Sequence, residues 1–442
     1  MYLERSIDAE LLTWKESAKR KPLLIRGARQ VGKSTAVRHL SKTFEFFIEI
    51  NFDEQTPYQI LFNQATDLDS LLEQLSILTQ TPIVEGKTLL FLDEIQASIP
   101  AISILRYFYE KKPNLHVIAA GSLLEFALAE LPSFGVGRVR SMFVYPFSFV
   151  EFLGALNEKP LIQLLQRATP TQPLALIFHE KLKLYLKKFL IIGGMPQALE
   201  TYISTRDLLE VQRVLDDLVL SIQADFVKYK KQLPPASIKA VFDSVVQQIG
   251  NKFKYSEADG SLRINAVKQI LEFLQMAGLV YPVLHSSSNG IPLGAEVNPK
   301  KSKLLLFDTG IYQRILGLDL ASLLLKDDAD VVNKGHIAEL YVGLELIKLK
   351  SCYENTGLYY WHREAKNSQA EVDYVISHHD NIIPIEVKAG TKGAMQSMHL
   401  FMKEKKSPLG LRLSLENFSQ FDAIKVLPLY AISVLPNIVQ QQ

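Results

Sequence analysis

The chain has 442 residues, a length that predicts two to four domains of about 100–150 residues each. Lysine and arginine number 49 against 47 aspartates and glutamates. The resulting formal net charge of +2 excludes a uniformly basic nucleic-acid coat and an acidic tail protein, although not a local basic groove. The single cysteine, Cys352, excludes an internal disulfide and a cysteine-based zinc knuckle.

The first fourteen residues carry acidic side chains and lack the apolar segment of a secretory signal. Across the chain, no apolar run reaches the roughly 18 uninterrupted residues that a membrane-spanning helix needs. We therefore expect a cytoplasmic protein with no membrane partner.

Residues 22–147 alternate apolar, strand-like runs with amphipathic stretches. This alternation is typical of a mostly parallel sheet with helices on both faces, and it predicts an α/β fold. The third run is apolar without alternation, as expected of a central strand buried on both sides. The expected strands are Leu23–Ile25, Phe46–Asn51, Thr88–Leu92, His116–Ala120 and Ser141–Tyr145.

From about residue 151 to residue 231 the pattern becomes helical, with expected helices at His179–Leu190 and Leu208–Val219. A new segment opens at Pro234–Pro235. It predicts two helices followed by two strands, which is the order of a winged helix-turn-helix. Those elements are Ile238–Ile249, Ile264–Ala277, Leu279–Leu284 and Lys303–Phe307.

The last part of the chain begins after a charged stretch at Lys326–Asp330. A helix and then three strands are expected there, at Ile337–Leu349, Leu358–Trp361, Glu371–Ile376 and Ile382–Val387.

Residues 27–35 read GARQVGKST and match the phosphate-binding motif G-x-x-x-x-G-K-[ST] between an expected strand and an expected helix. Glycines let the backbone curl and present its N–H groups to phosphate oxygens, and the helix N-terminus adds positive dipole. Lys33 is expected to reach the β- and γ-phosphates, and the Ser34 hydroxyl to ligate Mg²⁺. The expected nucleotide contacts in this loop are Gly27, Gln30, Val31, Gly32, Lys33, Ser34 and Thr35.

Two acids, Asp93 and Glu94, follow the apolar run TLLFL. Asp93 is expected to hold the hydration shell of Mg²⁺, and Glu94 to polarise the attacking water. The alternative for this pair is an acidic N-cap of the next helix.

Two further positions are catalytic candidates. Ser122, after the fourth expected strand, could orient the attacking water, or it could cap the following helix. Arg138 lies in a loop before the fifth expected strand and could reach the γ-phosphate of a neighbouring subunit, or it could be solvated.

These motifs resemble the AAA+ ATPases over residues 20 to about 230. The resemblance implies a helical lid after the core. In signal-transducing (STAND-type) ATPases, a glycine-x-proline element of that lid approaches the adenine, and the GGMP at residues 193–196 is similar to it. The resemblance thus implies a nucleotide contact at Pro196, whose alternative is a plain helix-breaking turn.

The C-terminal part carries a second acidic arrangement. Asp373 lies in one expected strand, Glu386 lies in the next, and Lys388 directly follows that second strand. Alternation along a strand places Glu386 and Lys388 on one face. Two carboxylates that hold Mg²⁺ beside a lysine suit metal-assisted phosphodiester hydrolysis. The alternative is a salt-bridged solvent face on an edge strand.

This arrangement resembles the restriction-endonuclease-like PD-(D/E)xK nucleases, although no proline precedes Asp373. The resemblance implies a further metal-binding acid at Glu339 on the preceding helix. The whole chain is similar to a prokaryotic family that joins an AAA-type domain to a winged helix and a nuclease-like domain. The expected domains are residues 1–155 (ATPase core), 156–231 (helical lid), 232–325 (winged helix) and 326–442 (nuclease-like).

Two functions follow as hypotheses. In the first, ATP and Mg²⁺ binding and ATP hydrolysis control a nuclease-like domain on nucleic acid, most naturally DNA, in a homo-oligomer. In the second, the chain is a nucleotide-gated assembly switch whose C-terminal part cleaves nothing. The cluster Lys300, Lys301 and Lys303 is the expected phosphate contact of the winged helix.

Overall fold

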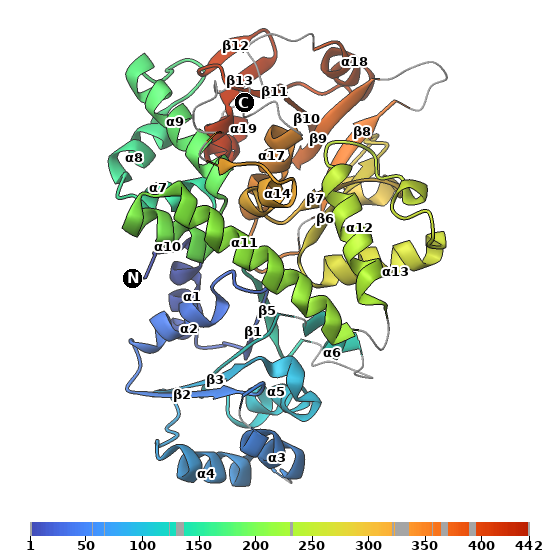
Figure 1. Ribbon diagram of the computed structural model, residues 1–442. Coiled ribbons are helices and arrows are strands. Elements are labelled where there is room, and N and C mark those ends of the chain that lie inside the picture. The colour runs from blue at the N-terminus through green and yellow to red at the C-terminus, as the bar shows by residue number, and fades with distance from the viewer. Residues whose placement is uncertain are drawn as a thin grey trace. The chain divides into compact units, whose positions relative to one another are not determined.

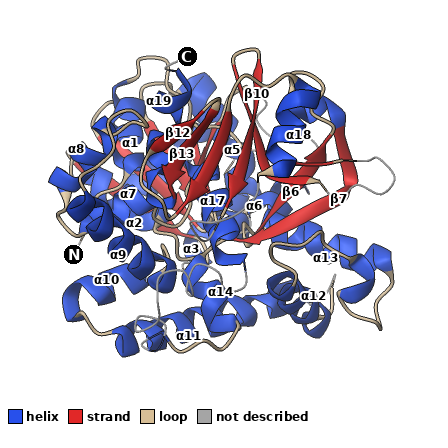
Figure 2. Ribbon diagram, turned by 90° about the horizontal axis from the view of Figure 1, so that it is seen from above, coloured by secondary structure: helices blue, strands red, loops and turns tan. Residues whose placement is uncertain are grey.

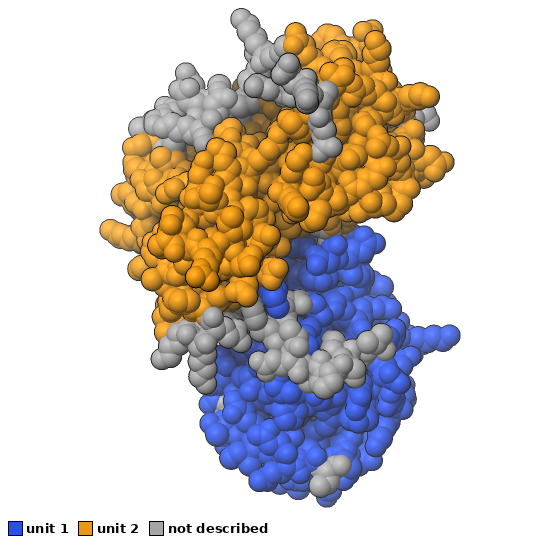
Figure 3. All heavy atoms as spheres, turned by 90° about the vertical axis from the view of Figure 1, so that its right-hand side faces the viewer, with its two compact units in different colours: residues 1–145, 276–279, 351–355 blue, residues 146–275, 280–350, 356–442 orange. Residues whose placement is uncertain are grey.

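The computed structural model describes residues 2–54, 56–65, 67–122, 124–129, 137–229, 233–320, 322, 336–355, 357–363, 370–388 and 395–440. The chain forms two compact units (Figure 3). The first comprises residues 1–145, 276–279 and 351–355, and the second comprises residues 146–275, 280–350 and 356–442.

The first unit is built on a five-stranded sheet in the order β2-β3-β4-β1-β5 (Figure 1). Every neighbouring pair is parallel, so the expected α/β fold with a parallel sheet is confirmed. Both central strands, β3 and β4, are buried along their whole length, as the apolar run of β3 predicts. The strands are β1 (Leu23–Arg26), β2 (Phe46–Asn51), β3 (Thr88–Asp93), β4 (His116–Ala120) and β5 (Arg140–Phe143).

Helices connect these strands, as parallel pairing requires. Side chains of α3, α4 and α5 pack with β2 and β3 in one apolar cluster that includes Phe52, Leu71 and Leu105. Short polar side chains cap two of these helices: Asp67 accepts from the Ser70 N–H and Ser98 from the Ala101 N–H. The helices are α1 (Ser6–Glu16), α2 (Lys33–Ser41), α3 (Thr56–Gln64), α4 (Leu68–Thr79), the 3₁₀ turn η1 (Ile95–Ala97), α5 (Ile99–Lys111) and α6 (Leu124–Ala129).

The second unit has an eight-stranded mixed sheet in the order β12-β13-β11-β10-β9-β8-β6-β7, drawn in red in Figure 2. Antiparallel pairs join β6 to β7, β8 to β9, β9 to β10 and β12 to β13, and the other pairs are parallel. Its strands are β6 (Val280–Ser286), β7 (Val297–Leu306), β8 (Leu358–His362), β9 (Glu371–His378), β10 (Asn381–Val387), β11 (Gly410–Ser414), β12 (Ser419–Phe421) and β13 (Ile424–Pro428).

Helices make up the rest of the second unit. They are α7 (Phe149–Ala155), α8 (Lys159–Arg167), α9 (Leu176–Ile192), α10 (Pro196–Thr205), α11 (Leu208–Asp225), α12 (Pro235–Gln247), α13 (Ile264–Met276), α14 (Thr309–Ile315), α17 (Ile337–Lys348), α18 (Gln396–Lys405) and α19 (Leu435–Gln440). The 3₁₀ turns are η2 (Phe226–Tyr229), η3 (Tyr255–Glu257), η4 (Leu293–Glu296) and η6 (Leu429–Val434).

The helices and strands expected for a winged helix occur in the expected order. The two strands that would form its wing, β6 and β7, do not stand alone as a pair. Strand β6 pairs in parallel with β8, with Val283 opposite Leu358. An unpaired strand edge readily accepts another strand, and here β8, about 75 residues later in the chain, pairs with the edge of β6. The two strands are therefore part of the larger sheet, and a winged helix is not confirmed. The boundary expected at residues 326–330 lies outside the described residues.

Within the described part of the chain, no helix has the length and apolar character needed to cross a membrane.

His116 gives the first unit a predicted pH dependence. Its Nε2 lies 3.1 Å from the Lys15 carbonyl oxygen, whereas its Nδ1 is buried with no hydrogen-bond partner among the described residues. Burial, with a contribution from the charge of Arg20, lowers the pKa of His116 from 6.5 to about 4. The unfolded chain therefore binds more protons between these values, and the first unit should lose stability as the pH falls from about 6.5 to 4.

The measurement is denaturant unfolding at pH 7 and pH 5, followed by Trp14 fluorescence in a Trp361→Phe background. Trp14 packs edge-on against His116, with ring centroids 5.8 Å apart, so it reports on this unit. The His116→Phe variant should lose less stability on acidification than the His116 protein. Equal losses in the two proteins would contradict the assignment.

Candidate functional site

The phosphate-binding motif forms a tight loop between β1 and α2. Gly27 has φ +145°, and a Cβ at this position would lie 2.1 Å from the Val144 carbonyl oxygen, so only glycine fits. Gln30 and Gly32 also have positive φ, at 63° and 94°, and Gly32 is the N-cap of α2. The loop therefore ends at a helix N-terminus, as the motif predicts.

Lys33 opens α2 and is only 6% exposed. Its Nζ donates hydrogen bonds to the carbonyl oxygens of Gly27 and Ala28, at 3.0 and 2.8 Å. Burial lowers the pKa of Lys33 to about 8, against the charges of Glu94 and Asp93, which raise it. The lysine side chain thus lies across the loop, where its ammonium group donates to neutral carbonyl groups.

The residues expected to hold Mg²⁺ lie together beside this lysine. Asp93 is the last residue of β3 and is 4% exposed. Burial raises the pKa of its carboxyl group, and a hydrogen bond from the Ser34 side chain acts in the opposite direction. A hydroxyl and a carboxylate are hard oxygen ligands, so this pair fits Mg²⁺ that is shared with a bound phosphate.

The position after Asp93 is strained. Glu94 has φ +49°, and its N–H donates to Asp93 Oδ1 at 3.0 Å. The Gln96 side-chain amide donates to Glu94 Oε2. A Cβ on Gly121, which follows β4, would lie 2.2 Å from Gln96 Oε1. Gln96 therefore lies between Glu94, the predicted catalytic acid, and Gly121 at the end of β4. Ser122, the next residue, is 8% exposed.

Sequence reasoning missed Gln96, because a glutamine two residues after the acid is not part of the motif. It also missed Gly278, which directly follows the expected helix Ile264–Ala277. Residues 276–279 belong to the first unit, and a Cβ on Gly278 would lie 3.1 Å from the Ala28 nitrogen in the phosphate-binding loop. Only the tertiary fold brings this segment to the loop.

The remaining predicted residues of the first unit have other surroundings. Val31 is fully buried, and its carbonyl oxygen accepts from Arg5 Nη1 at 2.8 Å. Gln30 and Thr35 are exposed. Arg138 is half exposed and forms an ion pair with Glu110 of α5. Its predicted role at the phosphate of a neighbouring subunit stays a prediction.

The GGMP segment of the second unit is fixed by Asp308. This buried carboxylate accepts from the Gly194 N–H at 2.6 Å and, as the N-cap of α14, from the Ile311 N–H at 2.9 Å. A Cβ on Gly193, which has φ +79°, would lie 2.3 Å from Asp308 Oδ1. Pro196 then begins α10. Its predicted adenine contact remains untested.

We expect Asp308→Ala to lower the free energy of unfolding by about 2–4 kcal/mol. The change removes a helix cap, worth about 0.5–2 kcal/mol, and leaves the buried Gly194 N–H without its acceptor, at a cost of about 1–3 kcal/mol. Urea unfolding followed by circular dichroism measures the loss.

The matched control is Asp207→Ala. Asp207 also caps a helix, through the Leu209 N–H at 2.7 Å, but it is exposed, so the loss should be about 1 kcal/mol. Similar losses for the two variants would contradict the role of Asp308.

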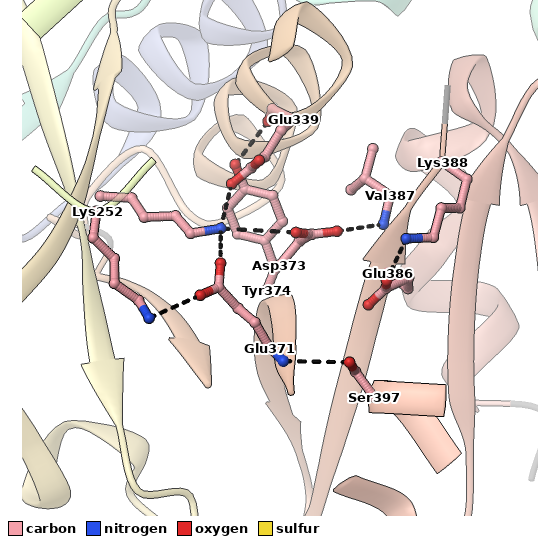
Figure 4. Close-up of polar contacts among 10 residues, drawn as sticks. Lys252, Glu339, Glu371, Asp373, Tyr374, Glu386, Val387, Lys388 and Ser397 are labelled. Carbon is pink, nitrogen blue, oxygen red and sulfur yellow. Dashed lines mark hydrogen bonds and ion pairs between the residues drawn. The ribbon is translucent and has the colours of Figure 1, made fainter. Parts of the chain in front are cut away.

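Three of the C-terminal acids, Glu339, Glu371 and Asp373, lie near one buried lysine, and Figure 4 labels these three acids. Lys303 of β7 is 2% exposed, and its Nζ lies 2.8 Å from Glu339 Oε1, 2.7 Å from Glu371 Oε1 and 3.7 Å from Asp373 Oδ1. Lys252 Nζ lies 3.2 Å from Glu371 Oε2. We call these five residues the Lys303 cluster. Lys303 is therefore not the expected phosphate contact, because its side chain is buried beside carboxylates; for Lys300 and Lys301 that contact stays a prediction.

The charges of the Lys303 cluster stabilise one another. Burial alone would lower the pKa of Lys303, but the carboxylates of Glu339, Asp373 and Glu371 raise it far above its ordinary value. Lys303 and Lys252 in turn lower the pKa of Glu371 despite its burial. Burial raises the pKa of Glu339 to about 7, against the charge of Lys303.

Glu386 and Lys388 lie beside this cluster. Glu386 Oε1 is 2.6 Å from Lys388 Nζ, which confirms that the two side chains share one face of β10. Asp373 Oδ2 accepts from the Val387 N–H at 2.8 Å, so the three predicted residues lie close together. Burial, with the charge of Asp373, raises the pKa of Glu386 to about 7.

In the described part of the chain, no group of three or more histidine, cysteine, aspartate or glutamate side chains is arranged to hold a metal ion. The carboxylates of the Lys303 cluster face an ammonium group instead (Figure 4). Metal binding by Glu339, Asp373 and Glu386 therefore stays a prediction. Sequence reasoning missed the ion pair between Lys303 and Glu371, because their strands are about 70 residues apart in the chain.

Three family models match successive parts of the chain. Residues 19–153 match the AAA domain, which contains the phosphate-binding loop and the acids after β3. Residues 183–322 and 334–432 match two domains of unknown function, DUF8612 and DUF4143. No curated protein matches the chain.

Several solved structures are similar to the chain at low identity. A Walker-type ATPase of Pyrococcus abyssi is 16% identical, over 72% of this chain and 96% of that one, with a TM-score of 0.45. The Orc1 protein of Aeropyrum pernix, solved in complex with DNA, is 14% identical over 73% and 95% of the two chains, with a TM-score of 0.30. A STAND protein of Pyrococcus horikoshii is 10% identical over 79% and 51%, with a TM-score of 0.28.

Proposed function

We propose that this protein binds ATP with Mg²⁺ at residues 27–35 and hydrolyses it. The observation that carries the proposal is the convergence of Lys33, Ser34, Asp93 and Glu94 at the ends of β1 and β3, inside the region that matches the AAA domain. The curled loop before α2 supplies backbone N–H groups for phosphate oxygens.

Each residue then has a defined task. Lys33 exchanges its two carbonyl partners for phosphate oxygens. The buried ammonium group then has a negatively charged partner in place of two neutral ones. Ser34 and Asp93 are the residues that would hold Mg²⁺, which, when bound with ATP, neutralises phosphate charge. Glu94, positioned by Gln96, orients the attacking water and accepts its proton.

The rest of the chain is proposed to respond to the nucleotide that the first unit binds. We infer that nucleotide state acts on the helical and C-terminal parts, and that the chain works as a homo-oligomer on nucleic acid, with DNA the first candidate. The resemblance to the AAA+ ATPases supports this extension, together with the order of the three matched regions. Cleavage of nucleic acid has no support from the geometry of the C-terminal acids.

The Lys33→Ala variant should bind ATP with Mg²⁺ about 10–100-fold more weakly than the wild type, because charge-assisted hydrogen bonds to phosphate contribute about 1.5–3 kcal/mol. Isothermal titration calorimetry with ATP and with GTP measures the loss and the preferred base.

The matched control is Lys42→Ala, which removes an exposed lysine just beyond the end of the same helix. It should bind ATP like the wild type. Unchanged ATP binding in Lys33→Ala, or no ATP binding by the wild type, would overturn the proposed function.

The Glu94→Gln variant should bind ATP normally and hydrolyse it about 10²–10⁴-fold more slowly, because the amide cannot accept the proton of the attacking water. Phosphate release under saturating ATP measures kcat. Glu85→Gln, an exposed glutamate in the loop before β3, is the control and should keep the wild-type rate. A Glu94→Gln protein as fast as the wild type would remove Glu94 from the mechanism.

A further inference from the structure

A buried lysine lies among three of the C-terminal acids, Glu339, Glu371 and Asp373. The Lys303 ammonium group is within hydrogen-bond distance of Glu339 Oε1 and Glu371 Oε1, and Asp373 Oδ1 lies 3.7 Å away. These carboxylates come from helix α17 and strand β9, and Figure 4 labels all three residues in one close-up.

We propose that Lys303 is the permanent cation of this acidic cluster, and that the cluster therefore binds no divalent metal ion. The lysine replaces the metal electrostatically, and the C-terminal sheet does not carry out metal-dependent phosphodiester cleavage. This inference concerns the second unit alone and does not depend on the ATP site.

Both carboxylate oxygens of Glu371 and of Asp373 already have partners. Glu371 directs Oε1 to Lys303 and Oε2 to Lys252, at 2.7 and 3.2 Å. Asp373 directs Oδ1 to Lys303, and its Oδ2 accepts from the Val387 N–H at 2.8 Å. A metal ion would have to displace two ammonium groups and one backbone hydrogen bond to obtain the same oxygens.

The charge count leads to the same conclusion. With every carboxylate ionised, the three of the Lys303 cluster face two lysines, which leaves one net negative charge. The adjacent Glu386 and Lys388 form an ion pair at 2.6 Å. A divalent ion added to this set would change its net charge from −1 to +1 in a largely buried site, where an unbalanced charge is poorly screened.

The backbone holds Lys303 in this position. It lies in β7 opposite Val283 of β6, and it also forms a β-bridge with Lys252. The Tyr360 ring lies 5.4 Å from its Nζ, and the Tyr374 hydroxyl donates to the Glu339 carbonyl oxygen at 2.7 Å. The lysine side chain therefore cannot leave without breaking its contacts with α17, β8 and β9.

The test measures Mn²⁺ binding to nucleotide-free full-length protein by the loss of the free Mn²⁺ electron paramagnetic resonance signal. We expect no binding to the wild type that depends on the C-terminal acids. Removing the ammonium group in Lys303→Met should create a site with a Kd of about 10⁻⁴ M or tighter, a gain of at least tenfold. Adding Asp373→Asn to that variant should abolish the gained binding.

Lys300→Met is the matched control, because it removes an exposed lysine from the same strand and should gain no Mn²⁺ binding. Both methionine variants keep the phosphate-binding loop, so their difference isolates the C-terminal site. If Lys303→Met does not fold, Lys303→Gln keeps hydrogen-bond donors without the charge and should gain Mn²⁺ binding in its place.

Two results would overturn the proposal. One is Mn²⁺ binding by the wild type that is lost in Asp373→Asn, which would show that metal and lysine coexist. The other is a folded Lys303 variant that gains no Mn²⁺ binding, which would show that the lysine does not take the place of a metal. Neither result bears on ATP binding, which the Lys33→Ala comparison tests separately.

Discussion

A charged group taken out of water must find a partner of opposite charge or a set of hydrogen bonds, and this requirement shapes each site of the protein. Lys33 is buried beside two carbonyl oxygens, Asp308 is buried against backbone N–H groups, and Lys303 is buried among carboxylates. The three groups differ in how completely that requirement is met.

The contrast between the two buried lysines separates a binding site from a structural one. Burial lowers the pKa of Lys33, because neutral carbonyl groups compensate its charge only in part. Phosphate oxygens would balance the remaining positive charge of Lys33, so the loop favours binding of an anion. Lys303 has the opposite environment: its carboxylates raise its pKa, and its charge is already balanced within the fold. The first lysine suits a ligand, and the second suits a permanent contact.

Local sequence patterns predicted the first unit well. Four of its five strands begin at the expected residue, because an apolar run between a turn and a helix leaves few alternative boundaries. The fifth begins one residue early, at Arg140, and ends at Phe143 rather than Tyr145. The loop from Gly27 to Lys33 was also predictable, since a motif confined to nine residues fixes its own backbone conformation.

The sequence by itself determined the parallel sheet, the phosphate-binding loop, the acids after β3 and the shared face of Glu386 and Lys388. Each of these depends on residues that are near one another in the chain or on the fixed period of a strand. Only the tertiary structure decided that β6 pairs with β8, that Gly278 lies against Ala28, and that Lys303 faces Glu339 and Glu371. Those contacts join distant segments, and a lysine in a polar run has the same sequence signature whether it faces solvent or three carboxylates.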